Sequence, residues 1–224
     1  MTTATTELDH IVVAASTLDA GRAWARDVLG VEPAGGGKHD GLATHNTLVK
    51  LDGRRYLEII AIDPDAGAPS FPRWFGLDTP EVRALIAHEP RLVAWVARCA
   101  GAPDAIEHLA ATPGYDARVV RPASRGDFRW RFAFTADGRR ISGGVLPHLI
   151  QWDCALHPCD RLPECDVALT ALTLGAVVPE RAAATLELLA LRADYGGAVV
   201  QVGQSSSPQI VATLQTPKGL VVLD

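Results

Sequence analysis

The sequence predicts an α+β fold built from two modules with the same order of elements: a strand, a helix and then further strands. This order runs over residues 7–62 and approximately again over residues 91–153. Alternating apolar and polar residues indicate the strands, and apolar residues at helical spacing indicate the helices. A chain of 224 residues can bury a large core, and its length suits one domain or two small ones.

The first module is expected at residues 1–65. Its helix begins at Ser16-Thr17-Leu18-Asp19, a sequence typical of a capping box. The helix ends at Gly30, where a residue free to adopt a left-handed conformation is favoured. The other expected elements are a strand at 8–13, a glycine-rich loop at 35–37, a strand at 44–51, a turn at Asp52-Gly53 and a strand at 56–62.

The rest of the chain divides into three further segments. Residues 66–89 are expected to form a linker loop and a helix, with Thr79 as its cap and Pro80 in its first turn. Residues 90–155 are expected to form the second module. Residues 156–224 are interpreted as a partial third module that covers a sheet face or edge or makes a subunit contact.

Two polar side chains interrupt otherwise apolar strands. His10 lies in the strand at 8–13, and Glu58 lies in the strand at 56–62. Strand side chains alternate between faces, so each shares its face with apolar neighbours. A buried carboxylate is costly unless its charge is compensated, and a divalent metal with an imidazole as second ligand would compensate it. The alternative is that both side chains meet water or hydrogen bonds at a strand end.

Several segments around these strands resemble a known family. They are Leu8-Asp9-His10, Thr44-His45-Asn46, Tyr56-Leu57-Glu58 and Arg73-Trp74-Phe75-Gly76-Leu77. Together they resemble the glyoxalase-like domain proteins of the vicinal oxygen chelate superfamily. The resemblance is strong over residues 7–80, weaker over 90–155 and slight beyond 165. It implies paired βαβββ modules with curved mixed sheets around a central cavity, to which this sequence adds the partial third module.

The resemblance also implies a set of metal ligands. In that superfamily the histidine of the first strand and the glutamate of the fourth bind metal, and these correspond to His10 and Glu58. The second module departs from this pattern, because Ala94 stands where a second histidine would be. Gln151 aligns with Glu58 and offers only a neutral carbonyl oxygen. The expected ligands of zinc, manganese, nickel or iron are therefore His10, Glu58 and Gln151. Three alternatives stay open: a weakly held metal, a metal site that the substrate completes, and no metal.

Five residues are expected to bind the substrate: His45, Asn46, Arg73, Trp74 and His148. An aromatic ring beside a guanidinium suits an anionic or carbonyl-bearing ligand. Imidazole is matched to neutral pH, so His45 is the candidate catalytic base, and Glu58 is the carboxylate expected to take part in proton transfer. The simpler alternatives are that His45 bonds a backbone carbonyl and that Asn46 stabilises a turn.

Two classes of function follow from the resemblance. One is a metal-dependent lyase or isomerase acting on a small carbonyl compound or oxygenated acid, with the metal as a Lewis acid. Dioxygenase chemistry would want two histidines and a carboxylate, so His45 or His148 would have to join the ligands. The other class is a protein that sequesters a small molecule without turning it over. Fold alone does not decide between them.

Composition argues against other partners. The formal net charge is −5 and the positive charges are scattered, which argues against a nucleic-acid surface. The sequence has no apolar run as long as a membrane span and no secretory signal, so we expect a cytoplasmic protein, for which a homodimer is one allowed assembly. Cys154, Cys159 and Cys165 have the spacing C-x4-C-x5-C, which differs from a structural zinc clamp. We expect a linker with reduced thiols there.

Overall fold

The computed structural model describes residues 4–192 and 199–224. Its centre is an eight-stranded sheet in the order β2-β3-β4-β1-β5-β8-β7-β6, and a second sheet has the order β10-β9-β11-β12. The strands are β1 (Thr5–Ala14), β2 (Ala34–His39), β3 (Thr44–Lys50), β4 (Tyr56–Ile62), β5 (Arg91–Ala100), β6 (Val119–Arg125), β7 (Phe128–Phe134), β8 (His148–Trp152), β9 (Ala168–Ala176), β10 (Val199–Gln204), β11 (Gln209–Thr216) and β12 (Gly219–Leu223).

Short helices connect these strands. They are α1 (Leu18–Trp24), α2 (Pro80–Leu85), α3 (Ala105–Ala110) and α4 (Pro179–Leu188). α1 is capped by Thr17, whose hydroxyl accepts a hydrogen bond from the backbone of Ala20, so the cap lies one residue later than expected. The helical path ends at Gly30 with a φ of 75°, as the sequence predicts. Across both described ranges, no helix is long and apolar enough to cross a membrane.

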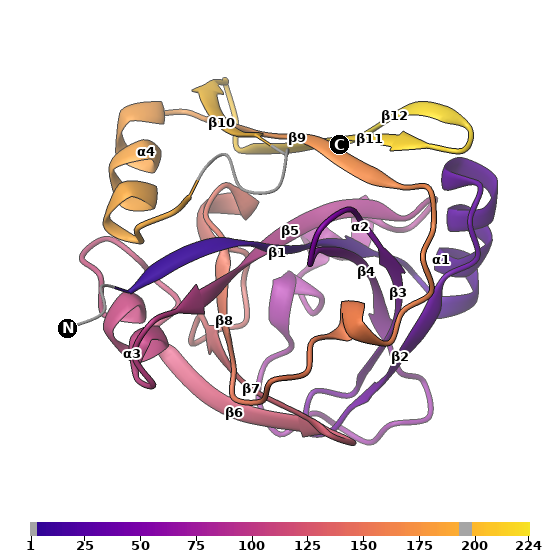
Figure 1. The fold of residues 1–224 in the computed structure, drawn as a ribbon, viewed down its shortest axis with the longest axis horizontal. Coiled ribbons are helices and arrows are strands. Elements are labelled where there is room, and N and C mark those ends of the chain that lie inside the picture. The colour runs from indigo at the N-terminus through magenta and orange to yellow at the C-terminus, as the bar shows by residue number, and fades with distance from the viewer. Residues whose placement is uncertain (1–3, 193–198) are drawn as a thin grey trace.

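β1 and β5 lie side by side and antiparallel at the centre of the main sheet. β4 pairs parallel with β1, and β8 pairs parallel with β5, so the two modules extend from this central pair in opposite directions. Figure 1 shows the sheet as a curved layer, with β6 and β7 at one end and β2 and β3 at the other. The predicted α+β fold with paired βαβββ modules and a curved mixed sheet is confirmed.

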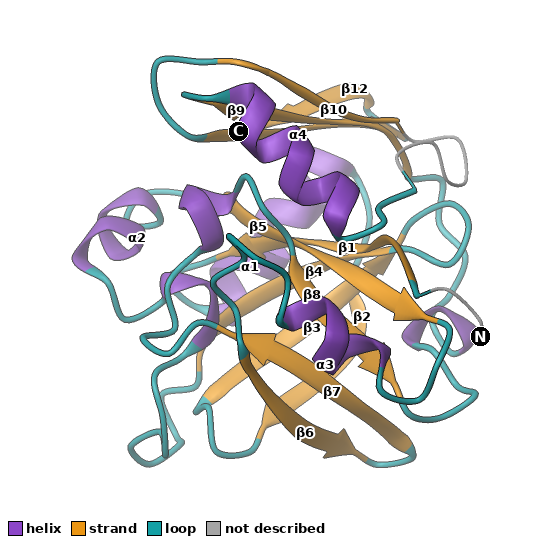
Figure 2. Cartoon of the chain, turned by 90° about the vertical axis from the view of Figure 1, so that its left-hand side faces the viewer, coloured by secondary structure: helices purple, strands orange, loops and turns teal. Residues whose placement is uncertain are grey.

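The two faces of the main sheet pack against different layers. On the convex face, apolar residues of β1, β4 and β5 join those of α3, α4 and the second sheet in one buried cluster. Figure 2 shows the second sheet and α4 stacked over β1 and β5, so the C-terminal segment covers a sheet face. The concave face instead carries an aromatic cluster that includes Trp74, Phe75, Trp130 and Phe132. The polar residues of interest lie among these aromatic rings.

The glycine-rich segment is a strand, β2, rather than the expected loop. It pairs antiparallel with β3, with His39 opposite Thr44. Gly36 has a φ of +85°, and a Cβ atom there would lie 2.1 Å from the backbone oxygen of Asn46. Only glycine allows this approach. The glycine run therefore lets β2 pack closely on β3 and brings His39 to the concave face.

The segment between β8 and β9 crosses the concave side of the main sheet, as the orange trace in Figure 1 shows. It is anchored on the first module, where Cys159 Sγ lies 3.2 Å from the backbone oxygen of Arg55 and Cys165 Sγ lies 2.9 Å from that of Lys50. All four cysteines are free in this structure. The segment is thus more than a connection, because it forms one wall of the concave side.

Candidate functional site

His10 and Glu58 meet on the concave face because β1 and β4 are adjacent and parallel. Both side chains are buried, with 3% and 5% of their surfaces exposed. His10 Nε2 lies 3.6 Å from Glu58 Oε2, which is too long for a direct hydrogen bond. The free space beside them is a narrow cavity of about 30 Å³, enough for a group of only a few atoms.

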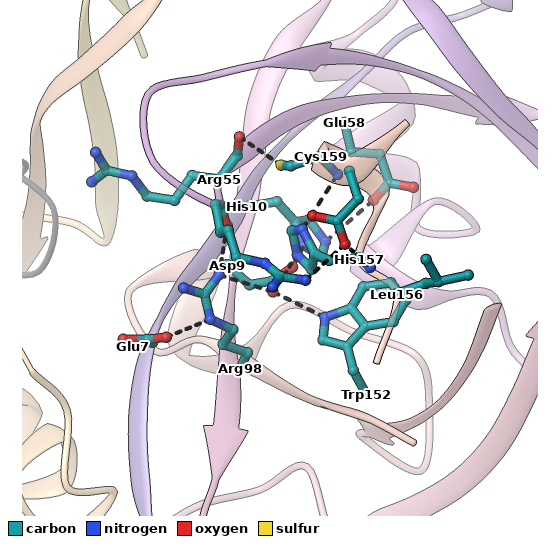
Figure 3. A network of polar contacts seen from close by, with 12 residues as sticks. Glu7, Asp9, His10, Arg55, Glu58, Arg98, Trp152, Leu156, His157 and Cys159 are labelled. Carbon is teal, nitrogen blue, oxygen red and sulfur yellow. Dashed lines mark hydrogen bonds and ion pairs between the residues drawn. The ribbon is translucent and has the colours of Figure 1, made fainter. Parts of the chain in front are cut away.

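A β-bulge brings a second carboxylate to His10. The pairing of β1 with β5 shifts register between Leu8 and His10, and Asp9 has no opposite residue. Such a bulge re-aims the side chain it contains. Asp9 is fully buried and receives three hydrogen bonds, at 2.6 Å from His10 Nδ1, 3.1 Å from His157 Nε2 and 3.0 Å from Trp152 Nε1 (Figure 3).

The ionisation of Asp9 determines the tautomer of His10. Burial by itself would raise the pKa of Asp9, but hydrogen bonds and charge from His10 and His157 lower it well below its usual value. Arg98 adds a positive charge 3.6 Å from Asp9 Oδ2. An ionised carboxylate can only accept hydrogen bonds, so Nδ1 of His10 carries a proton. With Nδ1 holding the proton, a neutral His10 ring would present the lone pair of Nε2 to Glu58.

Glu58 is held in place by an amide from β3. Asn46 Nδ2 donates to Glu58 Oε1 at 2.6 Å. Asn46 Oδ1 accepts from the backbone of Gly37 at 2.9 Å and from Arg125 Nη1 at 3.0 Å. These two donors fix the amide orientation, so its NH2 group faces the carboxylate. Asn46 therefore lies in the pocket, where it positions Glu58.

His39 is a site residue that the sequence analysis does not identify. Its Nε2 lies 4.0 Å from Glu58 Oε1, and its Nδ1 lies 3.0 Å from Thr44 Oγ1. The ring meets Trp74 edge-on, with 4.7 Å between centroids. Burial, together with the positive charge of Arg125, lowers the pKa of His39 to about 3. His39 is therefore neutral near pH 7 and can offer a hydrogen bond without carrying charge.

His157 and Tyr56 complete the surroundings of His10 and Asp9. His157 Nδ1 accepts a hydrogen bond from the backbone of Cys159 at 3.3 Å, which leaves Nε2 to donate to Asp9. Tyr56 stacks on the His10 ring at a centroid distance of 4.4 Å. Burial, reinforced by the charges of Asp9 and Glu58, raises the pKa of Tyr56 well above its usual value. In the sequence, the sign that could have pointed to His157 is its position inside the cysteine-containing linker.

Gln151 does not face Glu58, and its alignment with that residue is wrong. Its Oε1 accepts from the backbone of Ile106 in α3 at 2.9 Å, and its Nε2 donates to the carbonyls of Ala102 and Pro103, which precede α3. His148 instead lies next to Val96 in β5, as Glu58 lies next to Val12 in β1. His148 thus occupies the position in the second module that Glu58 has in the first.

His45 also lies away from the pocket. It pairs with Ala61, whereas its neighbour Asn46 points to Glu58, and successive strand residues point to opposite faces. His45 Nε2 is buried without a hydrogen-bond partner in the described ranges. The structure therefore does not bring the expected base to Glu58.

The remaining expected binding residues are Arg73, Trp74 and His148, and each has different surroundings. Arg73 pairs with Asp78 at 2.6 Å and donates to the backbone of Ala43, so its guanidinium is already occupied. Trp74 lines the narrow cavity.

His148 lies on the concave face but is enclosed by aromatic rings. It is 1% exposed, and its ring lies 5.5 Å from that of Phe132 and 5.1 Å from that of Phe75. Its Nδ1 lies 3.2 Å from the backbone oxygen of Ala133, and its Nε2 is among the buried atoms without a partner in the described part of the chain. Burial lowers the pKa of His148 to about 4, so the ring is neutral near pH 7.

A wider cavity of about 230 Å³ adjoins the narrow one. The two share His39, Trp74 and Trp130 in their walls. In the wider cavity the Arg121 guanidinium lies over Phe71, 4.2 Å from the ring centroid. A ligand with one small end in the narrow cavity can therefore extend between aromatic rings into the wider one.

The divalent metal predicted from sequence can be compared with these donors. His10 Nε2 and Glu58 Oε2 converge, and Asp9 holds the other ring nitrogen of His10, as carboxylates do for metal-binding histidines. Over residues 4–192 and 199–224, however, no group of three or more His, Cys, Asp or Glu side chains is placed to hold a metal ion. The side chains therefore supply two ligands rather than a complete site.

A solved structure of a hypothetical protein from Staphylococcus aureus has the same fold, with a TM-score of 0.60 and 12% identity over 92% of this chain and 90% of that chain. Two other solved structures are less similar. Methylmalonyl-CoA epimerase from Streptomyces coelicolor, in complex with 2-nitronate-propionyl-CoA, has a TM-score of 0.42 and 18% identity, with coverage of 67% and 96%. The epimerase from Mycobacterium tuberculosis has a TM-score of 0.40 and 19% identity, with coverage of 66% and 88%.

Comparison of the sequence with protein families identifies the chain more directly. Among the curated proteins, none matches it. The family model described as Glyoxalase-like domain matches residues 8–190, which span most of the chain and include both modules. The chain therefore belongs to the glyoxalase-like domain family.

Proposed function

We propose that this protein is an acid–base enzyme of the lyase or isomerase class that acts on a small carbonyl compound or oxygenated acid. Glu58 would remove or return a proton on a carbon next to the carbonyl. Its burial keeps bulk water away from the carboxylate and from the proton that it would transfer.

The observation that carries this proposal is the convergence of two electron-pair donors. Asp9 holds Nδ1 of His10, so a neutral His10 ring would present the lone pair of Nε2, which lies 3.6 Å from Glu58 Oε2. The separation leaves no direct hydrogen bond between the two groups and leaves space between them for a substrate group or a metal ion. Polar groups that are left unpaired in this way are found most often at functional sites.

Two neighbours would assist this chemistry. His39 is neutral and lies 4.0 Å from Glu58 Oε1, so an N–H from its ring can stabilise negative charge that develops on a substrate oxygen. Asn46 keeps the Glu58 carboxylate oriented while the proton moves.

A divalent metal would be held by His10 and Glu58, with its other ligands supplied by water or substrate, and would supply Lewis-acid polarisation of the carbonyl. Elemental analysis of protein supplied with zinc, manganese, nickel or iron tests this part. We expect His10→Ala and Glu58→Gln each to lose any metal that the wild type retains. A wild type that stays metal-free would restrict the proposal to the side chains alone.

Hydrogen exchange tests the catalytic proposal. Candidate 2-hydroxy acids, 2-oxo acids and aldehydes are incubated with protein in D2O, and loss of the carbon-bound proton is followed by NMR. We expect exchange with the wild type, a decrease of about 100-fold or more in Glu58→Gln, and no change in Glu107→Gln, which alters an exposed carboxylate.

Two outcomes would count against an enzyme. Equal exchange with the wild type and Glu58→Gln would remove Glu58 from the chemistry. Compounds that bind but do not exchange would favour the second class of function, sequestration of a small molecule. A cytoplasmic location and a homodimer stay predictions from the sequence.

A further inference from the structure

Arg125 places a positive charge beside the Glu58 pocket. It lies at the end of β6 in the second module and lines the narrow cavity together with residues of the first module. Its Nη1 donates to Asn46 Oδ1 at 3.0 Å, and the same amide donates to Glu58. One amide group therefore separates the guanidinium from the carboxylate.

This guanidinium has no carboxylate partner in the described ranges, where its hydrogen bond goes to the neutral Asn46 amide. Arg131, on the neighbouring strand β7, shows the contrast, because it pairs with both Glu107 and Asp153 at 2.7 Å. A guanidinium carries five N–H donors, so Arg125 keeps several of them for a ligand. An unpaired cation at a partly buried cavity is a place for an anion.

The cavity next to Arg125 has room for more than an anionic group. On β6, Arg121 and Ala123 share the face of Arg125, because side chains two residues apart in a strand point the same way. They run from the narrow cavity to the wider one of about 230 Å³, where Trp74 and Trp130 form apolar walls. The charged position is thus continuous with an aromatic-lined space.

We propose that Arg125 is the specificity-determining residue of this site and binds the carboxylate of an organic acid whose apolar tail lies in the wider cavity. This rests on the proposed function in one respect, since it places the carbon next to that carboxylate beside Glu58. It also changes the expected location of anion recognition, from Arg73, which pairs with Asp78, to a residue of the other module. The resulting substrate class is a monocarboxylic acid with an apolar or aromatic substituent.

The competing explanation is that Arg125 only offsets the charge of Glu58. The two roles differ in what Arg125 does to ligands, because an electrostatic support for Glu58 would not distinguish a carboxylate from its amide. Phenylacetate and phenylacetamide form a matched pair of probes, with the same shape and different charge. Acetate tests the contribution of the tail.

Binding of these probes is measured by calorimetry or NMR titration with the wild type, Arg125→Gln and Arg129→Gln. Arg129 lies on the same hairpin but is exposed on the other side of β7, so its variant is a control for the loss of one charge. We expect phenylacetate to bind the wild type more tightly than acetate or phenylacetamide. Arg125→Gln should weaken phenylacetate binding by about tenfold or more, whereas Arg129→Gln should change it less than about twofold.

Three results would overturn the proposal: equal affinity for phenylacetate and phenylacetamide, unchanged phenylacetate binding in Arg125→Gln, or no binding of phenylacetate to the wild type. Glu58→Gln separates this proposal from the catalytic one. It should retain or strengthen phenylacetate binding, because it removes a nearby negative charge, while it loses hydrogen exchange. Anion binding with no exchange by the wild type would uphold Arg125 and contradict the proposed reaction.

Discussion

Asp9 accepts hydrogen bonds from His10, His157 and Trp152, so three segments of the chain converge on one buried carboxylate. The site therefore depends on the β-bulge at Asp9, which turns this side chain away from the face that regular alternation would give it. In a regular strand, Asp9 and His10 would point to opposite faces.

Replacement of Asp9 by Asn should destabilise the fold by about 2–4 kcal/mol, because an amide cannot accept all three hydrogen bonds and leaves buried donors unpaired. Since the folded-state pKa of Asp9 is depressed, its contribution is present above the unfolded pKa of about 3.8 and is lost as the pH falls below it. Urea denaturation at several pH values measures both effects. Asp127→Asn, at an exposed carboxylate paired with Arg161, is the control and should change little. An equally small effect at Asp9 would contradict this assignment.

His148 should make the protein sensitive to acid. Its pKa is lowered from 6.5 to about 4 by burial, so the unfolded chain binds a proton in this range and the folded chain does not. His148 therefore does not lower the free energy of unfolding above about pH 6.5. As the pH decreases toward 4, its titration lowers that free energy by roughly 3 kcal/mol. His148→Phe, which keeps the contacts with Phe75 and Phe132, should flatten the pH dependence in denaturation experiments. An unchanged slope would show that His148 does not titrate as described.

At the scale of elements, the sequence predicted the strands that follow simple alternation. His10, Glu58 and Asn46 lie on β1, β4 and β3, and their faces follow from strand periodicity. His39 was missed because the glycines of β2 are typical of a loop rather than a strand. Arg125 and His157 were missed because they reach the site from segments that are distant in the sequence. Gln151 was misplaced because an alignment error of three residues reverses the face of a strand residue.

The close packing of β2 on β3 can be tested at Gly36. Gly36→Ala would place a Cβ atom 2.1 Å from the Asn46 backbone oxygen, so β2 must move and His39 with it. Gly126 also has a positive φ, of +56°, but a Cβ there would meet nothing within 4 Å. Gly126→Ala should therefore lower the free energy of unfolding by about 1–2 kcal/mol, through backbone conformation alone. Gly36→Ala should lower it clearly more, because the Cβ atom also clashes. Similar losses in urea denaturation would mean that β2 does not approach β3 as described.

At the scale of the whole molecule, the C-terminal sheet and the main sheet share one buried cluster. Leu172 and Leu214 of the second sheet belong to the same cluster as Ile11 and Trp95 of the main sheet. A continuous core of this kind favours cooperative unfolding. The C-terminal segment would therefore stabilise the sheet whose other face carries the site.

Cooperative unfolding can be measured with separate reporters. The native tryptophans lie at positions up to Trp152, so their fluorescence follows the first two modules. Leu220→Trp adds a reporter at an exposed position on β12, where 67% of the side chain surface is accessible. We expect both signals to change at the same urea concentration. Two separate midpoints would show that the second sheet folds as an independent unit.

The proposed chemistry of the site depends on one lone pair, that of His10 Nε2 facing Glu58. Nitrogen NMR of the histidine rings measures it directly, with His10→Gln to assign the signals. We expect the proton of a neutral His10 ring to lie on Nδ1, bonded to Asp9, with Nε2 unprotonated. A proton found on Nε2 would contradict it, because the two electron-pair donors would then be an ordinary hydrogen-bonded pair.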